Sequence, residues 1–274
     1  MKASRYTVFV VGLALVLGCS HTMTGRRQLT LINDAKMDQM GVAAFEELKA
    51  QQKVSDDLML NEYVQCVTEA IVEVIPRDGG PADGRWEVLV FEDETPNAFA
   101  LPGAKIGVHT GMLDLATTSG QLAAVIGHEV GHVLLRHGNE RMSQAILADS
   151  AMQAGQIAAG AAGSQYQDII MGGLGVGAQY GVLLPFSRKH ENEADQVGQI
   201  FMAQAGFDPA EAIALWKAMG ALGGQKPAEW QSTHPSDTTR VTRLEANLPR
   251  AMEAYDLAKE AGKDPDCVPP VVYE

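Results

Sequence analysis

The stretch His128-Glu129-Val130-Gly131-His132 constrains this chain more than any other, because it places two imidazoles four residues apart around a carboxylate. Residues four apart on an α-helix lie nearly one above the other, so both imidazoles can reach one metal ion. Glu129 is rotated by about 100° from His128, which places its carboxylate beside the metal. A general base must stand there to deprotonate a zinc-bound water. The motif predicts a helix that carries a zinc hydrolase site.

The residues around this motif predict a buried helix with defined ends. Thr118 and Gln121 fit a capping box, and an apolar run extends from about residue 119 to 137. Gly138 is the expected stop. His137 is expected to be a helix-end histidine, which is favourable at the negative pole of the helix dipole.

A catalytic zinc usually has three protein ligands and one open position, so two histidines are not enough. A third histidine ten residues after the first would define one class, but Gly138 occupies that position. Segment 191–195, Glu-Asn-Glu-Ala-Asp, offers a carboxylate from a second helix instead. Glu191 and Asp195 share one helix face, so one can bind the metal while the other accepts a hydrogen bond from a ligand imidazole. Glu193 points elsewhere and is expected on the surface.

The remaining pattern predicts an α+β fold that is mainly helical and contains a small β-sheet. Segment 34–75 reads as two helices with a break at 54–56, and segment 86–91 reads as a strand. Segments 97–101 and 105–110 flank Pro102-Gly103 and predict a hairpin or a bent strand pair. Further helices are expected over about 188–205, 209–219 and 236–247, followed by a polar tail over 251–274.

The N-terminus has the features of a secretory signal. Lys2 and Arg5 precede an apolar run of about ten residues, which is too short to span a membrane. Segment 15–19 resembles the lipobox of bacterial lipoproteins, which implies lipidation of Cys19. The alternative is a plain secretory signal with an incidental cysteine. Ser20 is not the aspartate that retains lipoproteins at the inner membrane.

These features predict a signal peptide over 1–18 and a polar tether over 19–34. They indicate an outer-membrane lipoprotein that faces the periplasm and is held at the membrane by its lipid anchor. The formal net charge of −13 argues against a nucleic-acid partner.

Cys66 and Cys267 form a disulfide candidate in such an oxidising compartment, and two unpaired thiols are the alternative. Segment 151–182 is rich in Ala and Gly. It is expected to form closely packed small-residue helices or a mobile loop, with a membrane-inserted hairpin as the alternative. Its position between the two metal-binding motifs also makes it a candidate lid.

The two motifs together resemble the HtpX and CAAX-prenyl-protease family of zinc metallopeptidases, which are gluzincins. Segment 97–111 is similar to the edge strand of that family, and Ser232-Thr233-His234-Pro235 with Arg240 is similar to its downstream His-Pro segment. The resemblance covers residues 35–250, which it identifies as a zincin-like metallopeptidase domain. The chain is most similar to the BepA-like and Oma1-like branch.

This resemblance implies one Zn²⁺ per chain, bound by His128, His132 and Glu191, with Glu129 as general base and acid. Asp195 would orient a ligand histidine.

His234 would lie near the metal, where it either polarises the substrate carbonyl or caps the zinc in a resting state, and Arg240 would support its loop. The alternative for His234 is a loop histidine that caps a nearby turn. His21, His109 and His190 fit no such pattern and are expected to be structural or exposed.

The strand residues Asn97, Ala98, Phe99 and Ala100 are expected to hold an extended substrate by β-augmentation, which reads backbone more than side chains. The leading hypothesis is a zinc-dependent endopeptidase of the cell envelope that cleaves misfolded or unassembled proteins. The alternative is a chaperone-like factor that works with the outer-membrane assembly machinery and whose proteolysis is repressed or secondary.

Overall fold

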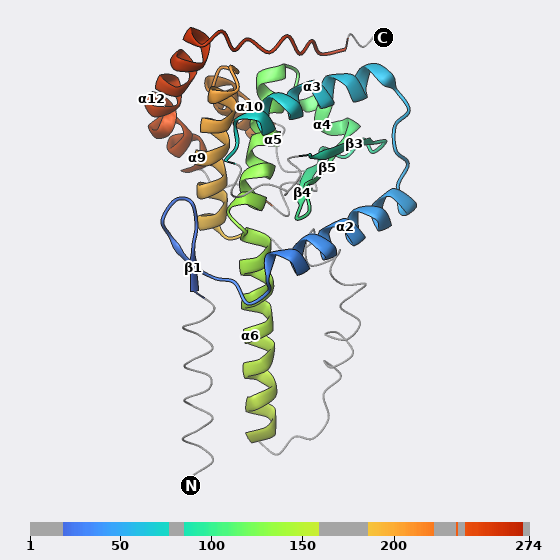
Figure 1. Ribbon diagram of the computed structural model, residues 1–274, viewed down its shortest axis with the longest axis vertical. Coiled ribbons are helices and arrows are strands. Elements are labelled where there is room, and N and C mark those ends of the chain that lie inside the picture. The colour runs from blue at the N-terminus through green and yellow to red at the C-terminus, as the bar shows by residue number, and fades with distance from the viewer. Residues whose placement is uncertain (1–18, 77–84, 159–185, 222–233, 235–238, 271–274) are drawn as a thin grey trace.

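A computed structural model of the chain describes residues 19–76, 85–158, 186–221, 234 and 239–270. The fold is mainly helical with small sheets, as predicted, and the helices surround a central helix α5 (Figure 1). The predicted signal peptide and most of the Ala/Gly-rich segment lie outside the described residues. Among the described helices, none is long and apolar enough to cross a membrane.

The described elements follow the chain in a simple order. Before the sheet come β1 (Cys19–His21), β2 (Arg27–Leu29), α2 (Asp34–Gln51) and α3 (Leu58–Val74). The three-stranded sheet consists of β3 (Glu87–Phe91), β4 (Ala98–Leu101) and β5 (Lys105–His109). After it come α4 (Thr110–Leu115), α5 (Ser119–Leu134), α6 (His137–Ala158), α9 (Arg188–Gln204), α10 (Ala210–Ala221) and α12 (Thr239–Glu260).

Helix α5 forms the centre of the core. Every residue from Leu122 to His132 is buried, and the helix packs against α3, α9, α10 and β4. Its N-terminus is capped as predicted, because the Thr118 hydroxyl accepts from the Gln121 amide. The Gln121 side chain accepts from the Thr117 amide at 3.0 Å and not from the Thr118 amide, so the predicted capping box is formed only in part. The motif therefore lies in the buried part of a capped helix.

The sheet has the strand order β3-β5-β4, so β4 lies at an edge. Strand β3 pairs in parallel with β5, and β4 pairs antiparallel with β5, with Phe99 opposite Gly107. The reversal between β4 and β5 uses Gly103 and Ala104, whose φ values are 81° and 59°. The predicted strand pair is confirmed.

Helix α5 ends earlier than predicted. The chain turns at Arg136, which has a φ of 56°, and α6 begins at His137, so Gly138 lies inside α6. The left-handed residue that favours a helix end is thus an arginine, and the prediction of a stop at Gly138 is wrong. His137 consequently lies at the start of a helix.

Two terminal segments are also more ordered than predicted. Strands β1 and β2 form an antiparallel hairpin, so this part of the expected tether is folded against α6. Helix α12 continues through Pro249 to Glu260, where a tail was expected. Its buried residues Leu244, Ala251 and Ala258 recur every seven positions, which keeps one apolar face in contact with the core beyond the proline.

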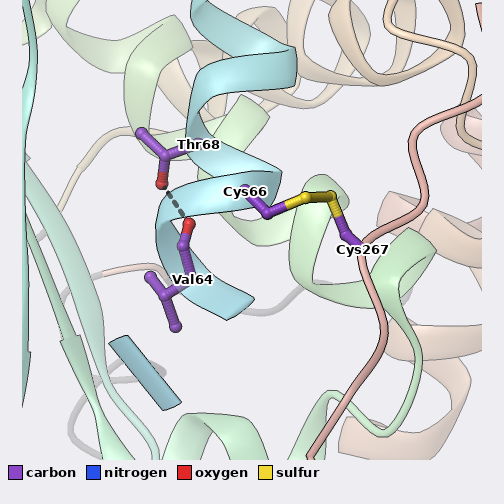
Figure 2. The surroundings of a disulfide bond; sticks show 4 residues. All are labelled: Val64, Cys66, Thr68 and Cys267. Carbon is purple, nitrogen blue, oxygen red and sulfur yellow. Dashed lines mark hydrogen bonds between the residues drawn. A yellow bond between two sulfur atoms is a disulfide. The ribbon is translucent and has the colours of Figure 1, made fainter. Parts of the chain in front are cut away.

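A disulfide joins Cys66 on α3 to Cys267, which follows α12 (Figure 2). The two cysteines are 201 positions apart in the sequence. The candidate pair is therefore bonded, and the bond connects the C-terminal segment to α3.

Candidate metal centre

The metal-binding motifs lie on two helices, α5 and α9, that cross at a pair of glycines. A Cβ added to Gly198 would lie 2.7 Å from the His128 backbone nitrogen, and one added to Gly127 would lie 2.9 Å from the Gly198 carbonyl oxygen. Larger residues would force the helices apart. This close crossing brings the histidine face of α5 against Glu191 of α9.

Four side chains converge at the crossing and can offer one ligand atom each. These atoms belong to His128, His132, Glu191 and His234, and they all lie within 4.8 Å of one another. The His128 and His132 Nε2 atoms are 3.0 Å apart, and Glu191 Oε1 lies 3.4 Å from His132 Nε2. Imidazole nitrogens with one carboxylate oxygen suit a divalent transition metal. The residues thus fit the metal that the sequence predicts.

His128 is oriented by Asp195 on the next turn of α9. Its Nδ1 lies 2.9 Å from Asp195 Oδ1. Burial lowers the pKa of His128, but its contacts with Asp195 and Glu191 outweigh burial and raise the pKa to about 9 in the metal-free chain. This places Asp195 where the sequence predicted it.

Arg240 of α12 supports both carboxylates. Its Nε and Nη2 atoms donate to Asp195 at 2.8 and 2.5 Å, and its Nη1 donates to Glu191 Oε2 at 2.6 Å. Its guanidinium lies 3.5 Å over the ring of Trp216. Arg240 therefore contacts the carboxylate of Glu191 itself. The residues on either side of His234 lie outside the described residues, so the predicted support of its loop by Arg240 stays a prediction.

Glu129 lies beside the four-residue cluster, next to its member His234. Glu129 Oε1 lies 3.4 Å from His234 Nε2, while His234 Nδ1 lies 3.2 Å from Glu191 Oε1. Both residues are buried. Glu129 is thus close to the cluster without being one of its four members.

His132 has partners that the sequence analysis missed. Its Nδ1 lies 2.9 Å from His137 Nδ1. The ring of Phe186 stacks on the His132 ring, with the ring centroids 3.8 Å apart. His137 Nε2 in turn lies 3.3 Å from Glu193. Burial is the main reason that the pKa of His137 falls to about 4.

Glu193 was expected on the surface, and that prediction is wrong. It is 8% exposed, because the β1–β2 hairpin covers it and Arg26 pairs with it at 2.6 Å. Among the other histidines, His109 and His190 are buried, whereas His21 is exposed. Helical spacing gave no signal for Glu193, since its partners come from a distant segment.

The predicted substrate strand reaches the same cavity as His132. A cavity of about 170 Å³ is lined by residues of β4, α2 and the site, including Ala100, Leu101, Met37, Gly41, His132 and Phe186. Asn97, Ala98 and Phe99 are buried, and Ala100 is partly exposed. The edge strand and one member of the metal-binding cluster, His132, thus line the same cavity.

Comparison with known proteins agrees with this geometry. The family described as Peptidase family M48 matches residues 59–248. The mitochondrial metalloendopeptidase OMA1 of Schizosaccharomyces pombe is 35% identical over 80% of this chain and 64% of its own. A putative beta-barrel assembly-enhancing protease of Vibrio cholerae is 30% identical over 74% of this chain and 42% of its own.

Metalloprotease LoiP of Escherichia coli is 26% identical over 78% of this chain and 81% of its own. The chain spans between 32% and 64% of the length of the first OMA1 relatives. The matched region contains both metal-binding motifs, the edge strand and Arg240. The chain therefore belongs to peptidase family M48, a family of metallopeptidases.

Proposed function

We propose that this protein is a zinc-dependent endopeptidase of the bacterial cell envelope that hydrolyses peptide bonds in misfolded or unassembled proteins. The observation that carries the proposal is the convergence of His128, His132 and Glu191, with the Glu129 carboxylate beside them. Two imidazoles and one carboxylate are the ligand set of gluzincin-type catalytic zinc sites.

When bound, zinc supplies Lewis-acid chemistry, which polarises a carbonyl and lowers the pKa of a water towards about 7. Glu129 takes the proton of the attacking water on a carboxylate oxygen and then delivers it to the leaving amide nitrogen. His234 Nε2 lies 3.4 Å from Glu129 Oε1, where the ring could donate to the developing oxyanion.

The free edge of strand β4 favours a peptide as the substrate. Strand β4 pairs with β5 on one side, so an extended peptide could add along its other edge by backbone hydrogen bonds. The cavity beside Ala100 and His132 would take one apolar side chain. Recognition through backbone hydrogen bonds selects unfolded, extended segments and requires no strict amino-acid sequence.

The envelope location rests on three observations. Cys19 ends a lipobox-like segment, and Cys66 and Cys267 form a disulfide, which persists in oxidising compartments. A relative from Vibrio cholerae is named as a putative beta-barrel assembly-enhancing protease. An outer-membrane lipoprotein that faces the periplasm, with the outer-membrane assembly machinery as a partner, satisfies all three.

One observation favours a second function, a chaperone-like assembly factor with repressed proteolysis. His234 Nδ1 lies 3.2 Å from both His128 Nε2 and Glu191 Oε1. A fourth protein ligand would occupy the position that a catalytic zinc keeps open for water.

The test is turnover of casein and of an unfolded outer-membrane protein by the full chain, purified in detergent with zinc. Glu129→Gln should lower turnover by about 100-fold or more while zinc remains bound, and Glu253→Gln, an exposed change on α12, should match wild type. Equal turnover by wild type and Glu129→Gln would exclude the assigned role of Glu129.

His234→Ala separates the two functions. A rise in turnover would show that His234 represses the site, whereas a fall would support its role at the oxyanion. If wild type and His234→Ala both bind the client without cleaving it, the chaperone-like function is correct.

A further inference from the structure

Each of the two ligand histidines, His128 and His132, is hydrogen-bonded to a second residue that can orient it. The sequence motifs predict only the partner of His128. His128 contacts the carboxylate of Asp195, which Arg240 neutralises. His132 contacts His137, which reaches the carboxylate of Glu193. Arg26 neutralises Glu193. Each ligand histidine is thus connected to a carboxylate and then to an arginine, directly for His128 and through one imidazole for His132.

We propose that His137 is a positioning residue for His132, and that Arg26 of the β1–β2 hairpin holds His137 in place through Glu193. The inference rests on the proposed metal site only in requiring that His132 binds the metal. It assigns a role in the site to the hairpin that begins at Cys19.

The donor and acceptor of each hydrogen bond from His132 through His137 to Glu193 follow from the metal-binding nitrogen at one end and the carboxylate at the other. A neutral imidazole that binds metal through Nε2 carries its proton on Nδ1. His132 Nδ1 therefore donates to His137 Nδ1, which must accept, so His137 carries its proton on Nε2. That nitrogen faces Glu193 Oε2 at 3.3 Å, and a carboxylate can only accept. With one tautomer each for His132 and His137, every donor in this series faces an acceptor.

Glu193, the last residue of this hydrogen-bonded series, is held by the β1–β2 hairpin. Arg26 Nε donates to Glu193 Oε2 at 2.6 Å, and the Thr24 hydroxyl donates to Glu193 Oε1. The other guanidinium nitrogens of Arg26 donate to Glu140 at 2.9 and 2.7 Å. Arg26 therefore connects the hairpin to α6 and α9 at once.

The ring of His137 is also fixed from its face. His190 stacks on it with ring centroids 4.4 Å apart, and His190 Nε2 lies 3.1 Å from Glu140 Oε2. His137 is fully buried, so no water competes for its nitrogens. Loss of an outer partner of this kind typically weakens metal binding by about 10- to 100-fold.

The test measures zinc affinity of the full chain by competition with a chromophoric chelator, together with the melting temperature of each metal-free variant. His137→Phe keeps an aromatic ring without the hydrogen bonds, whereas His137→Asn can keep an acceptor near the position of Nδ1. We expect zinc affinity to decrease in the order wild type, His137→Asn, His137→Phe, with a loss of at least about 10-fold for the last. A purely packing role predicts the reverse order for the two variants and would overturn the proposal.

Arg26→Gln and Arg27→Gln form a matched pair on the same hairpin, since Arg27 is exposed. We expect Arg26→Gln to lower zinc affinity and Arg27→Gln to leave it unchanged. If both bind zinc as wild type does, the hairpin has no role in the site. If wild type itself binds no zinc, the proposed function fails, which is a separate outcome.

Discussion

Arg240 Nη1 donates to Glu191 Oε2 at 2.6 Å, and both side chains are at most 2% exposed. The same guanidinium makes two bonds to Asp195. One arginine from α12 therefore neutralises the metal-binding carboxylate and the carboxylate that orients His128. Two buried carboxylates on one helix depend on a residue about fifty positions further along the chain.

Replacement of Arg240 should destabilise the metal-free chain strongly. Arg240→Gln removes the guanidinium that pairs with two buried carboxylates, and loss of one partner of a buried ion pair typically costs about 3–5 kcal/mol in free energy of unfolding. Urea unfolding in the presence of a chelator measures this loss. Arg250→Gln, an exposed change on the same helix, should remain within about 0.5 kcal/mol of wild type. A loss below about 1 kcal/mol for Arg240→Gln would contradict the ion-pair assignment.

The glycine contact between α5 and α9 should be sensitive to a single methyl group. Gly198→Ala would place a Cβ 2.7 Å from the His128 backbone nitrogen, so the helices must separate. Overpacking of this kind costs about 1–3 kcal/mol, and zinc affinity should fall because Glu191 moves away from the histidines. Gly220→Ala on α10 meets nothing within 4 Å and should leave both quantities unchanged. Equal zinc affinity in Gly198→Ala would show that the crossing distance is not critical.

The disulfide should contribute measurably to stability, because it closes a long loop in the unfolded chain. Replacement of Cys66 and Cys267 by serine should lower the free energy of unfolding by about 2–5 kcal/mol. A reductant should lower the stability of wild type by a similar amount and leave the double variant unaffected. A reductant effect of equal size in both proteins would point to another cause.

Stability should decrease at low pH through Glu140. Burial raises the pKa of this carboxyl, but bonds from His190 and Arg26 outweigh burial and hold it at about 2, below its ordinary 4.5. Between these values the native state binds fewer protons than the unfolded chain. The stabilisation is therefore complete above about pH 4.5 and is lost as the pH falls towards 2.

Urea unfolding of the metal-free chain between pH 6 and 3 tests this dependence without a contribution from metal release. Glu140→Gln should be less stable than wild type at pH 6 and should lose less stability on acidification. Glu253→Gln, an exposed change, should follow the wild-type curve. Parallel curves for Glu140→Gln and wild type would show that Glu140 does not carry the effect.

The sequence predicted most helices and strands because their signals are local. The Thr118 cap, the strand pair around Gly103 and the N-terminus of α10 after Asp208 depend on residues a few positions apart, and the structure contains each of them. The errors occurred where packing overrides a local signal. Pro249 lies inside α12 because one apolar face continues past it. Helix α5 ends at Leu134 and the chain turns at Arg136, although the glycine that favours a helix end follows two residues later.

By itself, the sequence determined the ligand pattern of the site, since the spacing of His128, Glu129 and His132 on one helix leaves few other uses for them. Only the tertiary structure decided what surrounds those ligands. Arg26 meets Glu193 across 167 positions and Glu140 across 114. Such contacts have no period along the chain, because they arise where separate helices and the hairpin pack together.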